Sequence, residues 1–218
     1  MSRTTSTLTK LRKKERETRR DLIIDAAIRL FATTPFDRVG MRDIASEAGL
    51  SPASIYRYFS NRDDLFVEAL CREIKSIEHE LRGLKRSSID QIGSAFVNHL
   101  LEHDTFFKMM THFMITGRIG EESLKKFNET ERKLLDVFDG IFENAGATES
   151  ARLISHAFFA ALNGVLITFH NYPGRPAEDT RKHMHRLVRI ISTVFSNSNA
   201  LNHAVDASGG QGAAEPRN

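Results

Sequence analysis

Apolar residues recur at intervals of three and four along most of the chain, which is the period of an amphipathic α-helix. Strand-like alternation of apolar and polar residues is almost absent. The first clear helical pattern, which Pro35 ends, is carried by Ile23, Ala26, Ala27, Leu30 and Phe31. Thr18–Asp21 have capping-box spacing at its start, although the helix could begin earlier. The pattern predicts an all-α fold.

Two short helices and one long helix follow. The first short helix has Met41, Ile44, Ala45 and Ala48 on one face and stops at Gly49. Ser51 and Pro52 then fit the N-cap and first turn of the second. Ser60 and Asp63 repeat the capping-box spacing and open a long helix to about residue 85. The remaining helices are expected near residues 88–103, 105–116, 121–144, 149–171 (capped by Thr148) and 178–197.

Residues 41–59 have the arrangement of a helix-turn-helix DNA-binding unit. Ala45 is small enough for two helices to cross closely, and Gly49 tolerates the positive φ of the turn. Four apolar residues are expected to clamp the pair from inside: Ile44, Leu50, Ile55 and Phe59. The outward face of the second helix, free to enter a major groove, carries Pro52, Ala53, Ser54, Tyr56, Arg57 and Tyr58.

Charge changes the picture at the N-terminus. The first twenty residues hold eight Lys/Arg and two Glu, although the whole chain has a net charge of only +3. Such a basic arm favours a polyanionic partner over a merely solvated, disordered tail. A single cysteine, Cys71, excludes a disulfide-stapled secreted module. We find no signal segment and no run of about 18 apolar residues, so we expect a cytoplasmic protein with no membrane span.

Residues 23–65 resemble the DNA-binding domain of the tetracycline-repressor (TetR) family. The matching residues are Ala26, Ala27, Leu30, Phe31, Met41–Ala45, Ala48–Ser51, Ile55–Phe59 and Asn61–Leu65. The sequence departs from the family pattern at Pro35, at Gly40, which offers no hydroxyl to a phosphate, and at Arg62, where lysine is usual. The rest of the chain agrees only in being helical and in length.

The resemblance implies a homodimer in which each recognition helix reads one half of a near-palindromic operator. By position, Tyr56, Tyr58 and Arg62 would contact phosphates. Candidate base-edge residues are Arg42, Ser54 and Arg57, with Pro52 and Ala53 available for thymine methyls. Ser51 completes the predicted DNA-binding set. The domain plan is therefore a basic arm, a helix-turn-helix domain, an effector-binding and dimerisation domain and a disordered tail, at residues 1–20, 21–65, 66–197 and 198–218.

Phenylalanine and methionine are concentrated in the middle helices, and such side chains pack cores or line adaptable apolar pockets. We predict a small hydrophobic or aromatic effector in a pocket lined by Phe96, His99, Phe106, Met110, Phe113, Met114, Phe138, Phe142, Phe159 and Asn163. His103 and His156 are further candidates for orienting it. The dimer is expected through the last two helices, by way of Leu153, Ala157, Ala160, Ala161, Gly164, Leu187, Ile190, Ile191, Val194 and Phe195.

The sequence leaves two rival functions open. His99, Glu102 and His103 match the H-x-x-E-H pattern of some zinc peptidases. They have no identifiable third ligand, so we expect neither an enzyme nor a metal or other cofactor. An architectural protein that binds any DNA sequence is the second alternative, and specificity would distinguish it from a regulator. The sequence favours a repressor that its effector releases from the operator.

Overall fold

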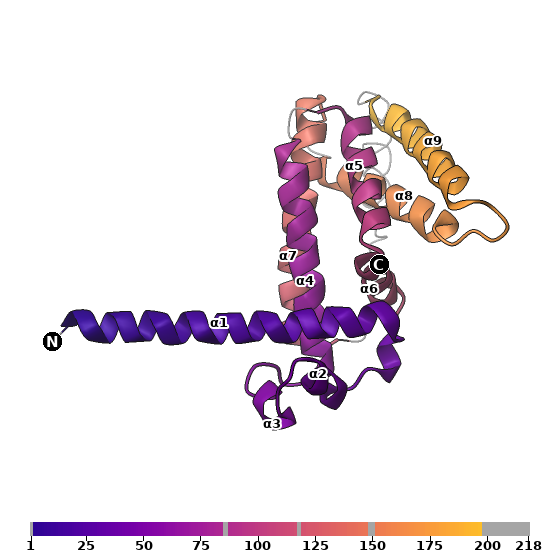
Figure 1. Cartoon of the computed structure of the whole chain (residues 1–218). Helices are drawn as coiled ribbons and strands as arrows, with labels where there is room; N and C mark the ends of the chain where they lie inside the picture. The colour runs from indigo at the N-terminus through magenta and orange to yellow at the C-terminus, as the bar shows by residue number, and fades with distance from the viewer. Residues whose placement is uncertain (1, 85–86, 117–118, 148–150, 198–218) are drawn as a thin grey trace, which may run out of the picture. The chain divides into compact units, whose positions relative to one another are not determined.

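A computed structural model describes residues 2–84, 87–116, 119–147 and 151–197. Within them every regular element is a helix, so the all-α prediction is confirmed (Figure 1). The elements are α1 (Ser2–Thr33), the 3-10 helix η1 (Phe36–Arg38), α2 (Met41–Glu47), α3 (Pro52–Ile55), α4 (Arg62–Gly83), α5 (Ile89–Glu102), α6 (Asp104–Thr116), α7 (Glu121–Asn144), α8 (Ala151–Phe169) and α9 (Ala177–Phe195). The predicted disordered tail and the predicted cap at Thr148 lie outside the described residues.

The chain forms two compact units. Unit 1 contains residues 1–73 and 104–128, and unit 2 contains residues 74–103 and 129–218. The long helices α4 and α7 each begin in unit 1 and continue into unit 2. Unit 1 therefore groups the predicted helix-turn-helix with α6 and the start of α7.

Helix α1 starts much earlier than the capping-box spacing predicted (Figure 1). Thr18 is inside the helix, where its hydroxyl donates to the carbonyl of Lys14, one turn back, at 3.0 Å. An ion pair between Arg19 and Glu15 at 2.8 Å bridges one turn of this exposed segment. The buried face begins only at Ile23. The described part of the predicted basic arm is thus helical and largely exposed.

An aromatic cluster joins four elements of unit 1. The ring of Phe66 on α4 lies 5.6 Å from Phe31 on α1 and 4.4 Å from Phe36 in η1. His112 on α6 lies 4.5 Å from Phe36. Helix α4 begins one residue later than predicted because Asn61, and not Ser60, caps it: Asn61 Oδ1 accepts from the amide of Asp64 at 2.8 Å.

In unit 2, α5 packs against α8 and α9. Gly93 permits this close approach, since a Cβ atom there would lie 3.1 Å from Phe158 on α8 and 3.2 Å from Val188 on α9. Phe158 also contacts the rings of Phe138 and Phe142 on α7, with centroids 5.8 and 5.5 Å away. These rings form the centre of the unit 2 core.

Helix α8 is long and apolar enough to cross a membrane by length and composition alone, a test that core helices of soluble proteins also pass. One face is buried, with Ile154, Phe158 and Leu162 at 2% exposure or less. An exposed apolar stripe runs along the other face through Leu153, Ala157, Ala160, Gly164 and Ile167. A one-sided helix of this kind is typical of a surface that packs against another protein.

The predicted dimer residues divide into two groups. Ile190 and Val194 on α9 are exposed at 61% and 59%, as are Leu153, Ala157, Ala160 and Gly164 on α8. Phe195 is half-buried and its ring also packs within the chain, 5.2 Å from Phe158 and 6.1 Å from Phe142, so its part in a dimer surface stays a prediction. Ala161, Leu187 and Ile191 are half-buried.

Candidate nucleic-acid interface

Helix α2 and the turn after it hold a fixed local geometry. The amide of Gly40 donates to the carboxylate of Asp43 at 2.8 Å, which caps α2 without a hydroxyl at the N-cap. At the other end, Leu50 N donates to Ala45 O at 2.9 Å and Gly49 N donates to Ser46 O at 3.1 Å. Gly49 has a φ of +65°. This pair of bonds is a Schellman motif, and it fixes the direction in which the chain leaves α2.

Helix α3 is a single turn held at both ends. The Ser51 hydroxyl accepts from the amide of Ser54 at 3.3 Å, and Pro52 takes the first helical position, as predicted. The chain after Ile55 continues as a turn, in which Phe59 N donates to Ile55 O at 3.1 Å. Ile55 and Phe59 are 0% and 3% exposed and anchor the segment from inside. The recognition helix is therefore shorter than the pattern indicated.

Most of the predicted DNA-binding residues lie together on the exposed side of this unit. Those classed as exposed are Arg42, Ser51, Pro52, Ala53, Tyr56 and Arg57. Tyr56 is 55% exposed although it is aromatic. Ser54 and Tyr58 are half-buried, and the hydroxyl of Ser54 lies 2.9 Å from that of Ser51. The bases that these residues would read stay a prediction.

Arg62 has a structural role that no sequence pattern indicates. Its guanidinium lies over the ring of Phe36, 4.4 Å from the centroid. Its Nη1 donates to the carbonyl oxygens of Phe36 and Val39 at 3.3 and 3.4 Å. These contacts tie the start of α4 to η1, and a phosphate contact by the same side chain stays a prediction.

Residues 23–69 match the model of the bacterial regulatory proteins of the tetR family. The chain belongs to the TetR family. This is a family of helix-turn-helix transcriptional regulators and not of enzymes, as the sequence predicted. The match begins at Ile23, so the solvated half of α1 lies outside it.

Two curated relatives and one solved structure illustrate the likeness. An uncharacterised regulator of Haemophilus influenzae is 34% identical over 99 residues, which cover 45% of this chain and 46% of the relative. The fatty acid metabolism regulator protein of Bacillus subtilis is 28% identical over 125 residues, covering 55% and 63%. The chain thus spans about half to under two thirds of these relatives. The solved structure of the regulator FadR from Bacillus subtilis, in complex with stearoyl-CoA, matches with a TM-score of 0.62. The match covers 81% of this chain and 97% of FadR at 18% sequence identity, so it supports the assignment of the fold.

In this TetR-family chain, part of the predicted effector set converges within unit 2. Phe96 on α5 lies 5.9 Å from Phe138 on α7 and 5.6 Å from Phe159 on α8, between ring centroids. One turn beyond Phe159, Asn163 is 1% exposed, and its Nδ2 donates to the carbonyl of Phe159 at 2.9 Å. The Oδ1 atom of Asn163 is buried and has no partner within the described part of the chain. A buried acceptor without a partner is a feature that a ligand donor can satisfy.

The other predicted effector residues have different environments. Phe142 packs in the unit 2 core. Four residues belong to unit 1: Phe106 and Met110 are buried, Phe113 packs 4.1 Å from Phe127, and Met114 is 47% exposed. Unit 1 also contains a cleft of about 430 Å³ lined by Phe31, Phe36, Phe66, Met109 and His112, among others. No predicted effector residue lines that cleft.

The H-x-x-E-H residues of this TetR-family chain are held by other side chains and by the backbone. His99 Nδ1 donates to Glu80 Oε2 at 2.6 Å, and His103 Nδ1 donates to the carbonyl of His99 at 2.8 Å. Glu102 pairs with Arg181 on α9 at 3.2 Å. Over the described ranges, no three His, Cys, Asp or Glu side chains gather as a metal site would require. His103 and His156 are exposed, which weakens their assignment as pocket residues.

Burial shifts the pKa of three side chains. Burial lowers the pKa of Lys126 and nearby Arg20 lowers it further, while Lys126 and Arg20 both pair with Glu68 on α4. Burial raises the pKa of Glu131 on α7, opposed by His156. Burial lowers the pKa of His185 on α9, with contributions from its charged neighbours.

Proposed function

We propose that the chain is a homodimeric, sequence-specific repressor that a small hydrophobic effector releases from its operator. The observation that carries the proposal is the exposed face of α3, which stands on a buried and hydrogen-bonded support. The Schellman turn at Gly49 and the anchors Ile55 and Phe59 fix that face without using its outward side chains. A rigid, solvent-facing helix start is what major-groove recognition requires.

We assign two kinds of DNA contact to this face. Tyr56, Tyr58 and Arg62 bind phosphates and set the register, while Arg42, Ser54 and Arg57 reach base edges. The exposure of Arg42, Tyr56 and Arg57 supports their part of this assignment. Ser54 reaches a base by rotating its hydroxyl away from Ser51.

The dimer forms through α8 and α9. The exposed apolar stripe of α8 runs from Leu153 to Ile167, and that of α9 consists of Ile190 and Val194 with the half-buried Leu187 and Ile191 beside them. Association of two copies gives a four-helix arrangement that removes both stripes from water. A two-fold dimer then presents two α3 faces to two half-sites of one operator.

The effector site is formed in unit 2 by Phe96, Phe138 and Phe159, with Asn163 and His99 as polar groups. The three rings supply an apolar wall, and Asn163 Oδ1 supplies a buried acceptor. FadR, which shares the fold, was solved with stearoyl-CoA, and this supports an acyl chain as one effector class. Helix α4 continues from unit 1 into unit 2. When the effector displaces α4, the spacing between the two α3 faces of the cytoplasmic repressor changes, and the dimer leaves its operator.

The test is binding of the full chain to DNA upstream of its own and adjacent genes, with random DNA as competitor. A footprint with two-fold symmetry that survives competition supports the repressor. A preference for the operator over random DNA of roughly 10³–10⁷ is expected. Equal affinity for every sequence overturns the proposal in favour of the architectural alternative.

The effector is tested with stearoyl-CoA as the first probe. We expect it to weaken operator binding, and operator DNA must weaken stearoyl-CoA binding by the same factor. Stearic acid and free coenzyme A separate the contributions of chain and head group. Identical affinity for the acyl ligand with and without operator contradicts the release mechanism.

A further inference from the structure

The solvated half of α1 and the turn after α3 line one groove of about 510 Å³ within unit 1. Its lining consists of Arg12, Glu15, Arg16, Arg19, Arg57 and Tyr58. Arg57 and Tyr58 follow Tyr56, the C-cap of α3, so the groove adjoins the predicted recognition face. None of the predicted effector residues lines this groove.

The groove is strongly cationic because four arginines face it with a single carboxylate. Glu15 is already paired with Arg19 at 2.8 Å. The side chains of Arg12, Arg16 and Arg57 form no ion pair or hydrogen bond in the part of the chain that the structure describes. Gathering like charges in one place is unfavourable without a counter-charge. The arrangement therefore fits a partner that brings several negative charges.

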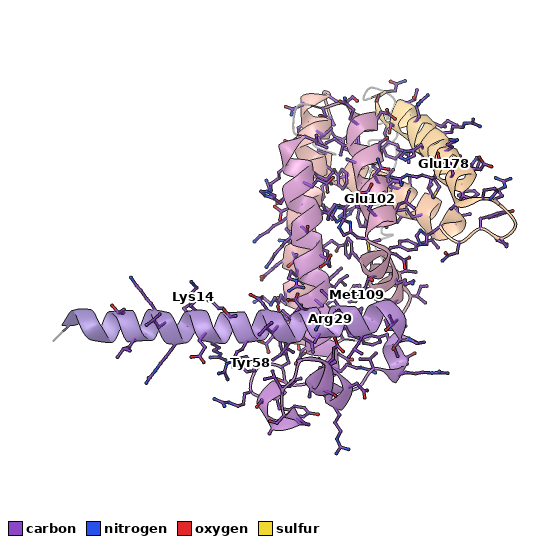
Figure 2. The ribbon with its side chains drawn as sticks, viewed as in Figure 1. Lys14, Arg29, Tyr58, Glu102, Met109 and Glu178 are labelled. Atoms are coloured by element: carbon purple, nitrogen blue, oxygen red, sulfur yellow. The ribbon has the colours of Figure 1, made fainter. Side chains whose placement is uncertain are left out.

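The arginines form a row on one face of α1. Positions 12, 16 and 19 are separated by four and three residues, so their side chains lie above one another along the helix. Lys10 and Lys14 fall on the opposite face of the same helix. Figure 2 shows Lys14 and Tyr58 on opposite sides of α1. A row of cations matches the row of phosphates along a DNA strand better than it matches one small anion.

Packing does not account for this segment. Residues 7–19 are all exposed, and the family match starts only at Ile23. Because a short helix of polar residues is marginal by itself in water, contact with a polyanion would also stabilise its helical form.

We propose that the Arg12–Arg16–Arg19–Arg57 groove binds the DNA backbone beside the bases that α3 reads, so that α1 lengthens the footprint of each subunit. The proposal rests on the proposed entry of α3 into the major groove. Guanidinium groups bind phosphate oxygens in forked, charge-assisted hydrogen bonds. The contact is independent of base sequence and adds affinity and register.

The experiment compares two double variants of the full chain, Arg12→Gln/Arg16→Gln and Lys10→Gln/Lys14→Gln. Both remove two positive charges from the same helix, on opposite faces. Affinity for a random-sequence duplex of three helical turns is measured at several salt concentrations, with circular dichroism to compare helix content. The salt slope is the slope of log affinity against log salt concentration, and each phosphate contact contributes about 0.9 to its magnitude. The arginine variant removes four arginines from a dimer, so the magnitude of the slope should fall by about 3.6.

We expect the large slope change in the arginine variant and a change below about 1 in the lysine variant. Footprints on the operator should shorten at their outer edges only in the arginine variant. Equal slope changes in both variants would mean that general charge, and not the groove, is responsible, and would overturn the proposal. An unchanged arginine variant would overturn it as well. If the unmodified chain shows no preference for an operator over random DNA, the proposed repressor function is wrong. The groove is then still tested by the salt slopes on random DNA.

Discussion

The guanidinium of Arg62 is stacked on the ring of Phe36, with Cζ 4.4 Å from the centroid, and the same group donates to carbonyl oxygens at both ends of η1. The first residue of α4 is thereby joined to the turn between α1 and α2. Phe36 also contacts Phe66 and His112, so the link extends into the aromatic cluster of unit 1. A residue assigned to phosphate binding by resemblance is thus a structural connector too.

Replacing Arg62 by lysine should separate these two roles. Lysine keeps the positive charge but loses the planar stack and the directed donors. We expect a loss of about 1–2 kcal/mol in the free energy of unfolding, with DNA affinity largely kept at temperatures where the variant is folded. Arg62→Ala should reduce both the free energy of unfolding and the affinity for DNA. Thermal unfolding at equal protein concentration and DNA titration measure the two effects, and an unchanged melting temperature in Arg62→Lys would contradict the structural role.

Gly49→Ala should destabilise the helix-turn-helix through the backbone alone. A Cβ atom at this position meets nothing within 4 Å, but the φ of +65° is unfavourable for alanine. We expect a cost of about 1–2 kcal/mol. Gly140→Ala on α7 is the matched control, since nothing crowds that position either, and there the helix should gain about 0.5–1 kcal/mol. Chemical denaturation should give opposite signs, and equal effects would refute the argument.

Ala160→Glu on α8 or Ile190→Glu on α9 should dissociate the proposed dimer. Each places a carboxylate in an exposed apolar stripe that association would bury. An unpaired buried charge costs about 3–5 kcal/mol, enough to raise the dimer dissociation constant more than a hundredfold. Analytical ultracentrifugation measures this. Lys182→Glu, elsewhere on the surface of α9, should leave the association state unchanged, and dimers that persist in both stripe variants would refute the interface.

Asn163→Leu should affect ligand binding and stability differently. It removes a buried acceptor that has no partner in the described structure, so the free protein should keep its melting temperature or gain slightly. If Asn163 Oδ1 orients the effector, affinity for stearoyl-CoA should fall about tenfold, the effect of one hydrogen bond. Isothermal titration calorimetry gives the affinity. A stable variant with unaltered affinity would remove Asn163 from the effector site.

The lowered pKa of His185 makes stability depend on pH. Burial and Arg181 disfavour the charged ring, and Asp90 on α5 only partly opposes them. The unfolded chain therefore binds more protons than the folded chain below the ordinary pKa of 6.5. Stability is full above that value and should fall as the pH drops below it. His185→Gln should show a smaller decrease in melting temperature between pH 7.5 and 5.5, and an identical decrease would contradict the assignment.

The sequence determined much of the recognition unit because its signals are local. The Ser51 N-cap, Pro52 in the first turn and the positive φ of Gly49 follow from the chemistry of single residues and their immediate neighbours. The periodicity of apolar residues likewise located the helices from α4 onward to within a few residues, since a helix must bury one face.

Tertiary structure decided what local signals could not. Phe195 fits an apolar stripe at the end of α9, but only the tertiary structure shows that its ring also contacts Phe142 and Phe158 within the chain. The capping-box spacing at Thr18 does not mark a helix start, because α1 continues through it. The row of arginines on α1 lines a groove only because Arg57 and Tyr58 lie beside it. Periodicity states which residues share a face, whereas what covers that face depends on contacts between segments far apart in the chain.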